Sequence, residues 1–163
     1  MGEYRGNEII VRYDEHTCTH SGNCVKTLPA VFNVNAKPWV NANGMMVANN
    51  NAELHTRKGD AAVFVDERGQ RIPGQWPGSP SPVEHDILTG STPEGTVLAG
   101  MTCNDWTSDS STVAAQVGHT DGLGPNANPA GNFASWNSSH ANASCADTAP
   151  RGGAGRLYCF AAK

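Results

Sequence analysis

The shortage of large apolar side chains is the feature that most constrains this fold. Leu, Ile, Val and Phe together make up 26 of the 163 residues, whereas Gly, Asn, Ser, Thr and Pro make up 66. Such a composition indicates disorder only where the net charge is also high. Here the formal net charge is −4, and the chain has four Trp and five Cys. We therefore expect a loop-rich domain with a small aromatic core, held partly by crosslinks or a metal.

Charge and apolar patterning exclude several classes of protein. No apolar run approaches the roughly 18 residues that a membrane-spanning helix needs. A weakly acidic chain without a block of Lys and Arg is not expected to bind nucleic acid. The first residues contain no apolar signal-peptide core. Helical periodicity is interrupted everywhere by Gly, Pro or Asn, which excludes a long helical bundle.

Short strands separated by loops are the expected elements. The alternation of apolar and polar residues predicts an edge strand in residues 8–14. The best candidate for a buried strand is 61–65, Ala-Ala-Val-Phe-Val. Further short strands are expected at 86–90, 114–119 and 157–160.

Two cysteines near the N-terminus enclose a short polar motif. Cys18 and Cys24 are separated by five residues, which include His20 and Gly22. Two thiolates around a loop that glycine allows to bend could hold one metal or cluster. Two free cysteines or a local disulfide would fit the same spacing.

Together with Phe32 and Lys37-Pro38-Trp39, this motif resembles the divergent 4Fe-4S mono-cluster family of small bacterial ferredoxin-like proteins. The resemblance covers residues 8–41, the first half of that family's fold, so the segment corresponds to a truncated ferredoxin-like unit. It implies a 4Fe-4S cluster bound by the two cysteines, with the histidine as a further candidate ligand. The family's later cysteine, in a Cys-Pro-Ser context, has no counterpart, because the next cysteine is Cys103. The ligand set is then smaller than the usual four.

The rest of the chain carries dispersed motifs in a fixed order. They are Thr89-Gly90-Ser91, Cys103-Asn104-Asp105-Trp106-Thr107, Val117-Gly118-His119-Thr120-Asp121, Ser135-Trp136-Asn137-Ser138-Ser139-His140, Cys145 and Gly152-Gly153-Ala154-Gly155-Arg156-Leu157-Tyr158-Cys159-Phe160. They resemble the endostatin-like domain of bacterial secreted proteins, which has a C-type-lectin-like fold. The resemblance implies an α+β domain with short antiparallel strands and long loops. Within it, the glycine-rich run from Gly152 is expected to form the turn into the last strand.

These two resemblances divide the chain into residues 1–38 and 39–163. The family domain begins with a strand, a helix and an early cysteine, and the cluster-like segment stands in their place here. The join near Pro38-Trp39 is therefore either chimeric or a natural fusion.

Cysteine pairing also follows from the second resemblance. It implies a disulfide between Cys103 and Cys145. The partner of Cys159 would be the missing early cysteine, so Cys159 pairs with Cys18 or Cys24, stays free, or pairs with another chain. Disulfides form in oxidising compartments and iron–sulfur proteins are assembled in reducing ones. The larger part thus implies an extracellular or cell-envelope location, whereas the absence of a signal peptide favours the cytoplasm.

Two further groups of residues are candidate sites. Aromatic and amide side chains could bind a sugar or, alternatively, fill the core and hold loops; they are Trp106, Asn104, Asp105, Trp136 and Asn137. Two imidazoles and one carboxylate could bind zinc or, alternatively, satisfy loop backbone groups; they are His119, Asp121 and His140. Calcium is a further possibility, because the stretch from Ile72 to Pro150 has acidic residues but no Lys or Arg.

We find no signature of a hydrolase, a zinc protease or a nucleotide-binding enzyme. The sequence therefore predicts a non-enzymatic binding module without a required cofactor, which recognises a glycan or a surface protein. The alternative is a small iron–sulfur protein that transfers electrons through the N-terminal cysteines.

Overall fold

The computed structural model describes residues 2–5, 10–13, 38–158 and 161–162. The motif from Cys18 to Cys24 lies outside these ranges, as does Cys159. Within the described part, no helix has both the length and the apolarity needed to cross a membrane.

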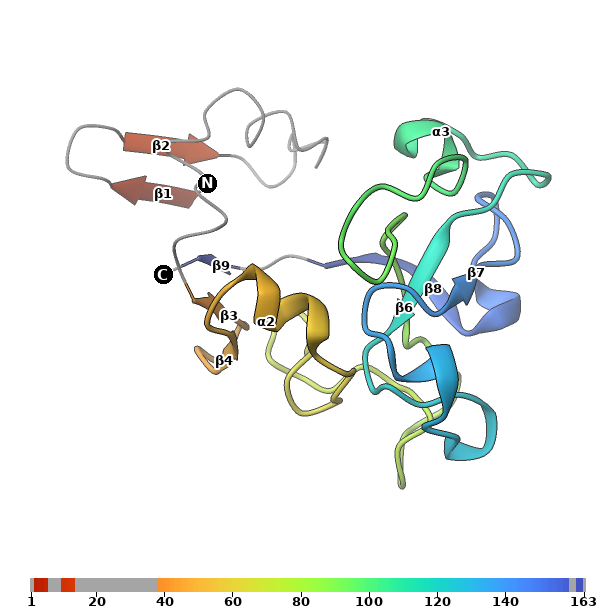
Figure 1. The fold of residues 1–163 in the computed structure, drawn as a ribbon, viewed down its shortest axis with the longest axis horizontal. Coiled ribbons are helices and arrows are strands. Elements are labelled where there is room, and N and C mark those ends of the chain that lie inside the picture. Colours follow the sequence, from red (N-terminus) through yellow and green to blue (C-terminus); the bar gives the residue numbers. More distant parts are fainter. Residues whose placement is uncertain (1, 6–9, 14–37, 159–160, 163) are drawn as a thin grey trace.

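Three small sheets account for the strands (Figure 1). The first is an antiparallel ribbon of β1 (Gly2–Arg5) and β2 (Ile10–Tyr13). The second has the order β4-β3-β9 and consists of β4 (Met46–Ala48), β3 (Trp39–Val40) and β9 (Ala161–Ala162). Because β9 pairs with β3, the end of the chain lies beside the residues that directly follow Pro38.

The third sheet has four strands in the order β7-β6-β5-β8. They are β7 (His140–Ala141), β6 (Gln116–His119), β5 (Asp86–Leu88) and β8 (Gly153–Leu157). All neighbours are antiparallel except β5 and β8, which are parallel. The strands predicted at 86–90 and 114–119 are confirmed in shorter form. The glycine-rich run was expected to be a turn, but Gly153 to Gly155 lie inside β8.

Helices are short, as the composition predicts. The α-helices are α2 (Asn51–Thr56) and α3 (Cys103–Trp106), and the 3-10 turns are η1 (Pro125–Ala127), η2 (Gly131–Ala134) and η3 (Ala149–Arg151). Asn50 caps α2, because its side chain accepts a hydrogen bond from the amide of Glu53. All four residues of α3 have φ between +48° and +64°, so α3 is a single left-handed turn.

The main apolar cluster joins β4 and α2 to distant loops. Its buried members are Val47, Ala48, Leu54, Val63, Phe64 and Trp136. The rings of Phe64 and Trp136 stack with centroids 5.4 Å apart, and the indole Nε1 donates to the carbonyl of Leu54 at 2.8 Å. The prediction of a buried strand at 61–65 is wrong. Val63 and Phe64 are buried, but the amides of both bond back to Asp60, which makes this segment a turn.

Polar side chains fill much of the remaining interior. In the described part, twelve apolar side chains are buried and eleven polar or charged ones are buried beside them. Asn137 illustrates their role, because its amide donates to the carbonyls of Thr92 and Pro93 and its oxygen accepts from Ser135. Buried amides here replace regular secondary structure as partners of the loop backbone.

Candidate functional site

A disulfide joins Cys103, at the start of the left-handed turn, to Cys145. The turn is further held by Thr102, whose hydroxyl accepts from the amide of Asp105 and donates to its carboxylate. A left-handed turn of residues with a Cβ is costly, at about 1–2 kcal/mol per residue. The disulfide and the hydrogen bonds of Thr102 hold the turn in this conformation. Trp106, its last residue, lies at the surface with 39% of the residue exposed.

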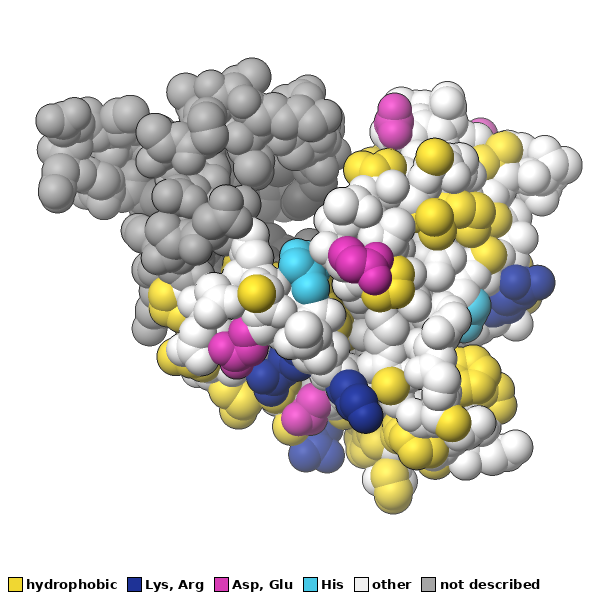
Figure 2. Space-filling model, viewed as in Figure 1, with side chains coloured by type: hydrophobic (Ala, Val, Ile, Leu, Met, Phe, Trp, Pro, Cys, Tyr) yellow, Lys and Arg dark blue, Asp and Glu magenta, His cyan; other side chains and the backbone are white. Residues whose placement is uncertain are grey.

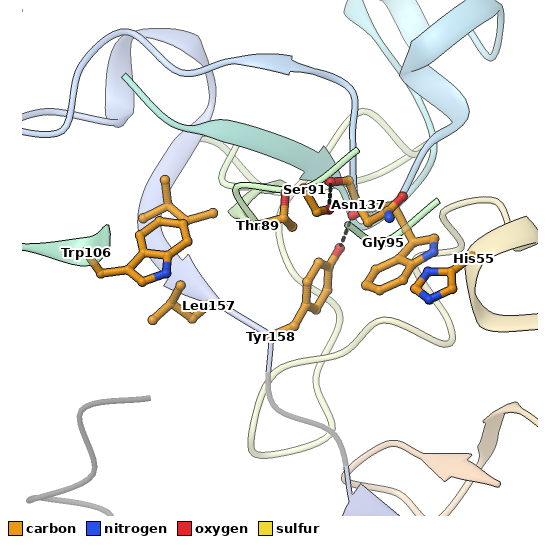
Figure 3. A pocket seen from close by; sticks show the side chains of 10 residues that line it. His55, Thr89, Ser91, Gly95, Trp106, Asn137, Leu157 and Tyr158 are labelled. Atoms are coloured by element: carbon orange, nitrogen blue, oxygen red, sulfur yellow. Dashed lines mark hydrogen bonds between the residues drawn. The ribbon is translucent and has the colours of Figure 1, made fainter. Parts of the chain in front are cut away.

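Trp106 lines one end of an open pocket of about 310 Å³ (Figure 3). Leu157 stands beside it and is 48% exposed. The other end is formed by Tyr158, His55 and the segment around Asn137. On the face shown in Figure 2, polar groups predominate and hydrophobic side chains form small separate groups.

The residues predicted to bind a sugar have different surroundings. Trp136 is 6% exposed and belongs to the apolar cluster, and Asn137 is buried with its amide engaged in the loops. Asn104 and Asp105 are exposed and bond within the left-handed turn. Trp106 therefore has the accessible aromatic surface of the set.

A second group of polar residues gathers around the carboxylate of Asp86, on the four-stranded sheet. Strand register explains the gathering. Asp86 pairs directly with His119 across β5 and β6, and His140 pairs with Val117 across β6 and β7. Side chains two residues apart on a strand share a face, so His140 is the diagonal neighbour of His119. We call the group formed by His85, Asp86, His119 and His140 the histidine cluster.

Three imidazole nitrogens converge on Asp86. The Nε2 atoms of His85 and His119 lie 3.4 and 3.2 Å from its Oδ1, and the Nε2 of His140 lies 3.6 Å from its Oδ2. The Nε2 atoms of His119 and His140 are 2.9 Å apart. The ring of His119 stacks between His85 and Phe133, with centroid distances of 4.2 and 5.8 Å.

Hydrogen bonds at the Nδ1 atoms of His85 and His140 define the tautomers of these two rings. A carbonyl can only accept, so the Nδ1 of His140, 2.9 Å from the Ala141 carbonyl, carries its proton. The Nδ1 of His85 lies 2.8 Å from Asp121 Oδ1 and donates to it. Burial works to raise the pKa of Asp121, but the bond and charge of His85 and the amides of Gln75 and Leu123 outweigh burial and lower this pKa.

The structure thus brings His119 close to each of the other two predicted zinc ligands, but in separate groups: His119 lies with His140 and Asp86, and also with Asp121 and His85. Sequence reasoning missed His85 and Asp86. The sequence offered one local signal, which is that His85 directly precedes, and Asp86 begins, a short apolar strand. Their contact with His119 and His140 depends on the pairing of strands that are far apart in the sequence, and the spacing of neighbouring residues does not predict that pairing.

Comparison with known proteins finds similarity in the first part of the chain. Residues 4–56 match the family described as divergent 4Fe-4S mono-cluster. The uncharacterized protein YjdI of Escherichia coli K12 and that of Escherichia coli O157:H7 are each 43% identical to this chain over 37 residues, which is 23% of this chain. The chain spans about half the length of these relatives, since the match covers 49% of each. No solved structure matches the chain. The N-terminal part is therefore similar to iron–sulfur proteins, and the endostatin-like resemblance of the later part stays a prediction.

Proposed function

We propose that this chain is an iron–sulfur protein whose N-terminal part carries a 4Fe-4S cluster and transfers electrons. The observation that carries the proposal is the match of residues 4–56 to the mono-cluster family, which includes Cys18 and Cys24. Thiolates are the usual ligands of such clusters, and four ligands are usual.

Chain connectivity supports a third cysteine ligand. The bridge between Cys103 and Cys145 leaves Cys18, Cys24 and Cys159 as the cysteines outside it. Cys159 stands two residues before β9, which pairs with β3 at the end of the N-terminal segment. Two residues span at most about 7 Å. We propose that Cys159 and His20 complete the ligand set.

Anaerobic reconstitution with iron and sulfide tests this function. We expect brown protein with equal amounts of iron and acid-labile sulfide, and loss of the colour in Cys24→Ser. Cys159→Ser should lower the cluster content or its stability to oxygen, and Ser21→Ala, inside the same motif, should leave it unchanged. Colourless protein with an intact Cys103–Cys145 bridge would contradict the proposal.

A second candidate function is favoured by the pocket. We propose that residues 39–163 form a C-type-lectin-like module without catalytic activity that binds a glycan or a surface protein. The accessible ring of Trp106 beside Leu157 offers an apolar face. Thr89 and Ser91 also line the pocket, and their hydroxyls donate to the carbonyl of Asn137. A glycan array read with the wild type and Trp106→Ala tests it, because binding should be lost in the variant. Trp76→Ala, which removes an indole outside the pocket, is the control.

A further inference from the structure

The carboxylate of Asp86 is buried without compensation from hydrogen bonds. Its side chain is fully buried, and neither oxygen accepts a hydrogen bond from any residue that the structure describes. A buried carboxylate without a hydrogen-bond partner lowers the stability of a fold. The groups that face it are three imidazole Nε2 atoms.

The hydrogen bond between two imidazoles limits how the cluster can be protonated. Because His140 carries its proton on Nδ1, neutral His140 presents a lone pair at Nε2, and neutral His85 does the same. The Nε2 atoms of His119 and His140 are 2.9 Å apart, so without an ion His119 donates to His140 and Asp86 accepts from neither ring. A metal cation at this point would instead be bound by both Nε2 lone pairs and by the carboxylate.

The spacing of the donor atoms fits a small tetrahedral ion. With zinc–nitrogen bonds of about 2.0–2.1 Å, neighbouring donors of a tetrahedron are separated by about 3.3 Å. Among Asp86, His119 and His140 the separations are 2.9 Å between the two Nε2 atoms, 3.2 Å from His119 to Asp86 Oδ1 and 3.6 Å from His140 to Asp86 Oδ2. Imidazole and carboxylate are ligand types that zinc accepts.

The outer contacts also fit. Histidine ligands of zinc normally donate their other N–H to a carboxylate or a carbonyl, which fixes the tautomer. His140 donates to the Ala141 carbonyl, and His85, beside the three ligands, donates to Asp121. The Nδ1 of His119 has no such partner among the described residues, so one of the two ligand rings is oriented in this way.

We propose that the histidine cluster is a zinc site, with Asp86 and the Nε2 atoms of His119 and His140 as its three protein ligands. Three protein ligands leave a fourth position for water, and His85 stands beside Asp86 as an outer partner. The ion would join β5, β6 and β7 where their side chains meet. Asp121, predicted from the sequence as a ligand, then orients His85 from outside.

Zinc binding by the full chain tests the proposal. The N-terminal thiolates also bind zinc, so the measurement uses Cys18→Ser/Cys24→Ser protein that has been stripped with a chelator. We expect one zinc ion per chain by mass spectrometry, and Co2+ in the same site should give the strong visible absorption of tetrahedral coordination. Loss of an outer partner weakens metal affinity about 10–100-fold. His85→Gln should fall in that range and Asp86→Asn should exceed it.

Two further variants keep the test decisive. The side chain of His140 is 29% exposed, more than those of the other residues in the cluster, so His140→Gln should disturb packing least. This variant replaces Asp86→Asn in the test if Asp86→Asn does not fold. His55→Gln removes an imidazole outside the cluster and should leave affinity unchanged. The proposal is overturned if the stripped double cysteine variant takes up no stoichiometric zinc. Zinc binding that is unaltered in both Asp86→Asn and His140→Gln would overturn it equally.

Discussion

The two parts of this chain differ in their cysteines. Cys103 and Cys145 form a disulfide in the larger part, whereas Cys18 and Cys24 belong to a segment that matches a family described as divergent 4Fe-4S mono-cluster. A disulfide is stable in an oxidising environment, and a cluster thiolate needs a reducing one during assembly. If the proposed cluster is present, the two parts therefore require different redox conditions.

The sequence match and the packing do not divide the chain at the same place. The family match extends to residue 56, yet residues from Trp39 onward pack with the larger part. Leu54 in α2 is buried against Trp136 and its carbonyl accepts the indole N–H. The end of the match is therefore not a boundary between independent folding units.

The largest effect expected is the loss of the disulfide. Cys103 and Cys145 are 42 residues apart, and closing a loop of that length stabilises a fold by about 4 kcal/mol in the chain-entropy model. We expect Cys103→Ser to unfold most of the larger part, as followed by tryptophan fluorescence in urea. An equal midpoint of unfolding with and without reductant in the wild type would contradict the crosslink.

A glycine in β6 gives the next largest effect. A Cβ on Gly118 would lie 1.7 Å from the carbonyl oxygen of Trp136, and backbone cannot easily move away. We expect Gly118→Ala to lower the free energy of unfolding by about 3 kcal/mol or more. Gly78→Ala is the matched control, because its positive φ carries a cost but nothing lies within 4 Å of the added atom. Similar urea midpoints for the two variants would show that β6 does not pack on this loop.

Trp136→Phe tests whether α2 belongs to the larger part. The change removes the hydrogen bond to Leu54 and part of the aromatic stack with Phe64. Loss of one buried hydrogen bond and some ring volume should cost about 2 kcal/mol. Hydrogen exchange should also speed up in residues 51–56 while β1 and β2 are unaffected. Unchanged protection of 51–56 would mean that this helix is held by the N-terminal part.

The smallest effect concerns Tyr158, whose hydroxyl donates to the carbonyl of Trp136. Burial, followed by the charges of Asp121 and Asp86, raises the pKa of this hydroxyl well above its usual value. A raised pKa keeps the native hydroxyl protonated. The stability it contributes is therefore complete below the unfolded pKa of about 10 and is lost as the pH rises above it. Tyr158→Phe should cost about 1 kcal/mol at neutral pH and flatten the alkaline decline in stability. A steeper decline in the variant would contradict the assignment.

Local signals in the sequence predicted part of this structure. The short apolar stretches around Ile87 and Val117 were sufficient to predict two of the central strands. The same kind of signal failed at 61–65, because Asp60 accepts the amides of Val63 and Phe64 and closes a turn. The histidine cluster was half predicted. His119 and His140 stood in recognisable motifs. The proximity of His85 and Asp86 to them results from pairing between strands more than 30 residues apart, which the sequence did not predict.

The pairing of β9 with β3 has a consequence for the order of folding. Trp39 and Ala162 are partners in this sheet although 123 residues separate them (39 to 162). During synthesis the N-terminal segment leaves the ribosome long before its neighbour β9 exists, and domains begin to fold as they emerge. A cluster could thus be inserted into the nascent chain while the base of that segment is still uncovered. Completion of the sheet is then a late event, and Cys159, if it is a ligand as proposed, would join the centre only at that stage.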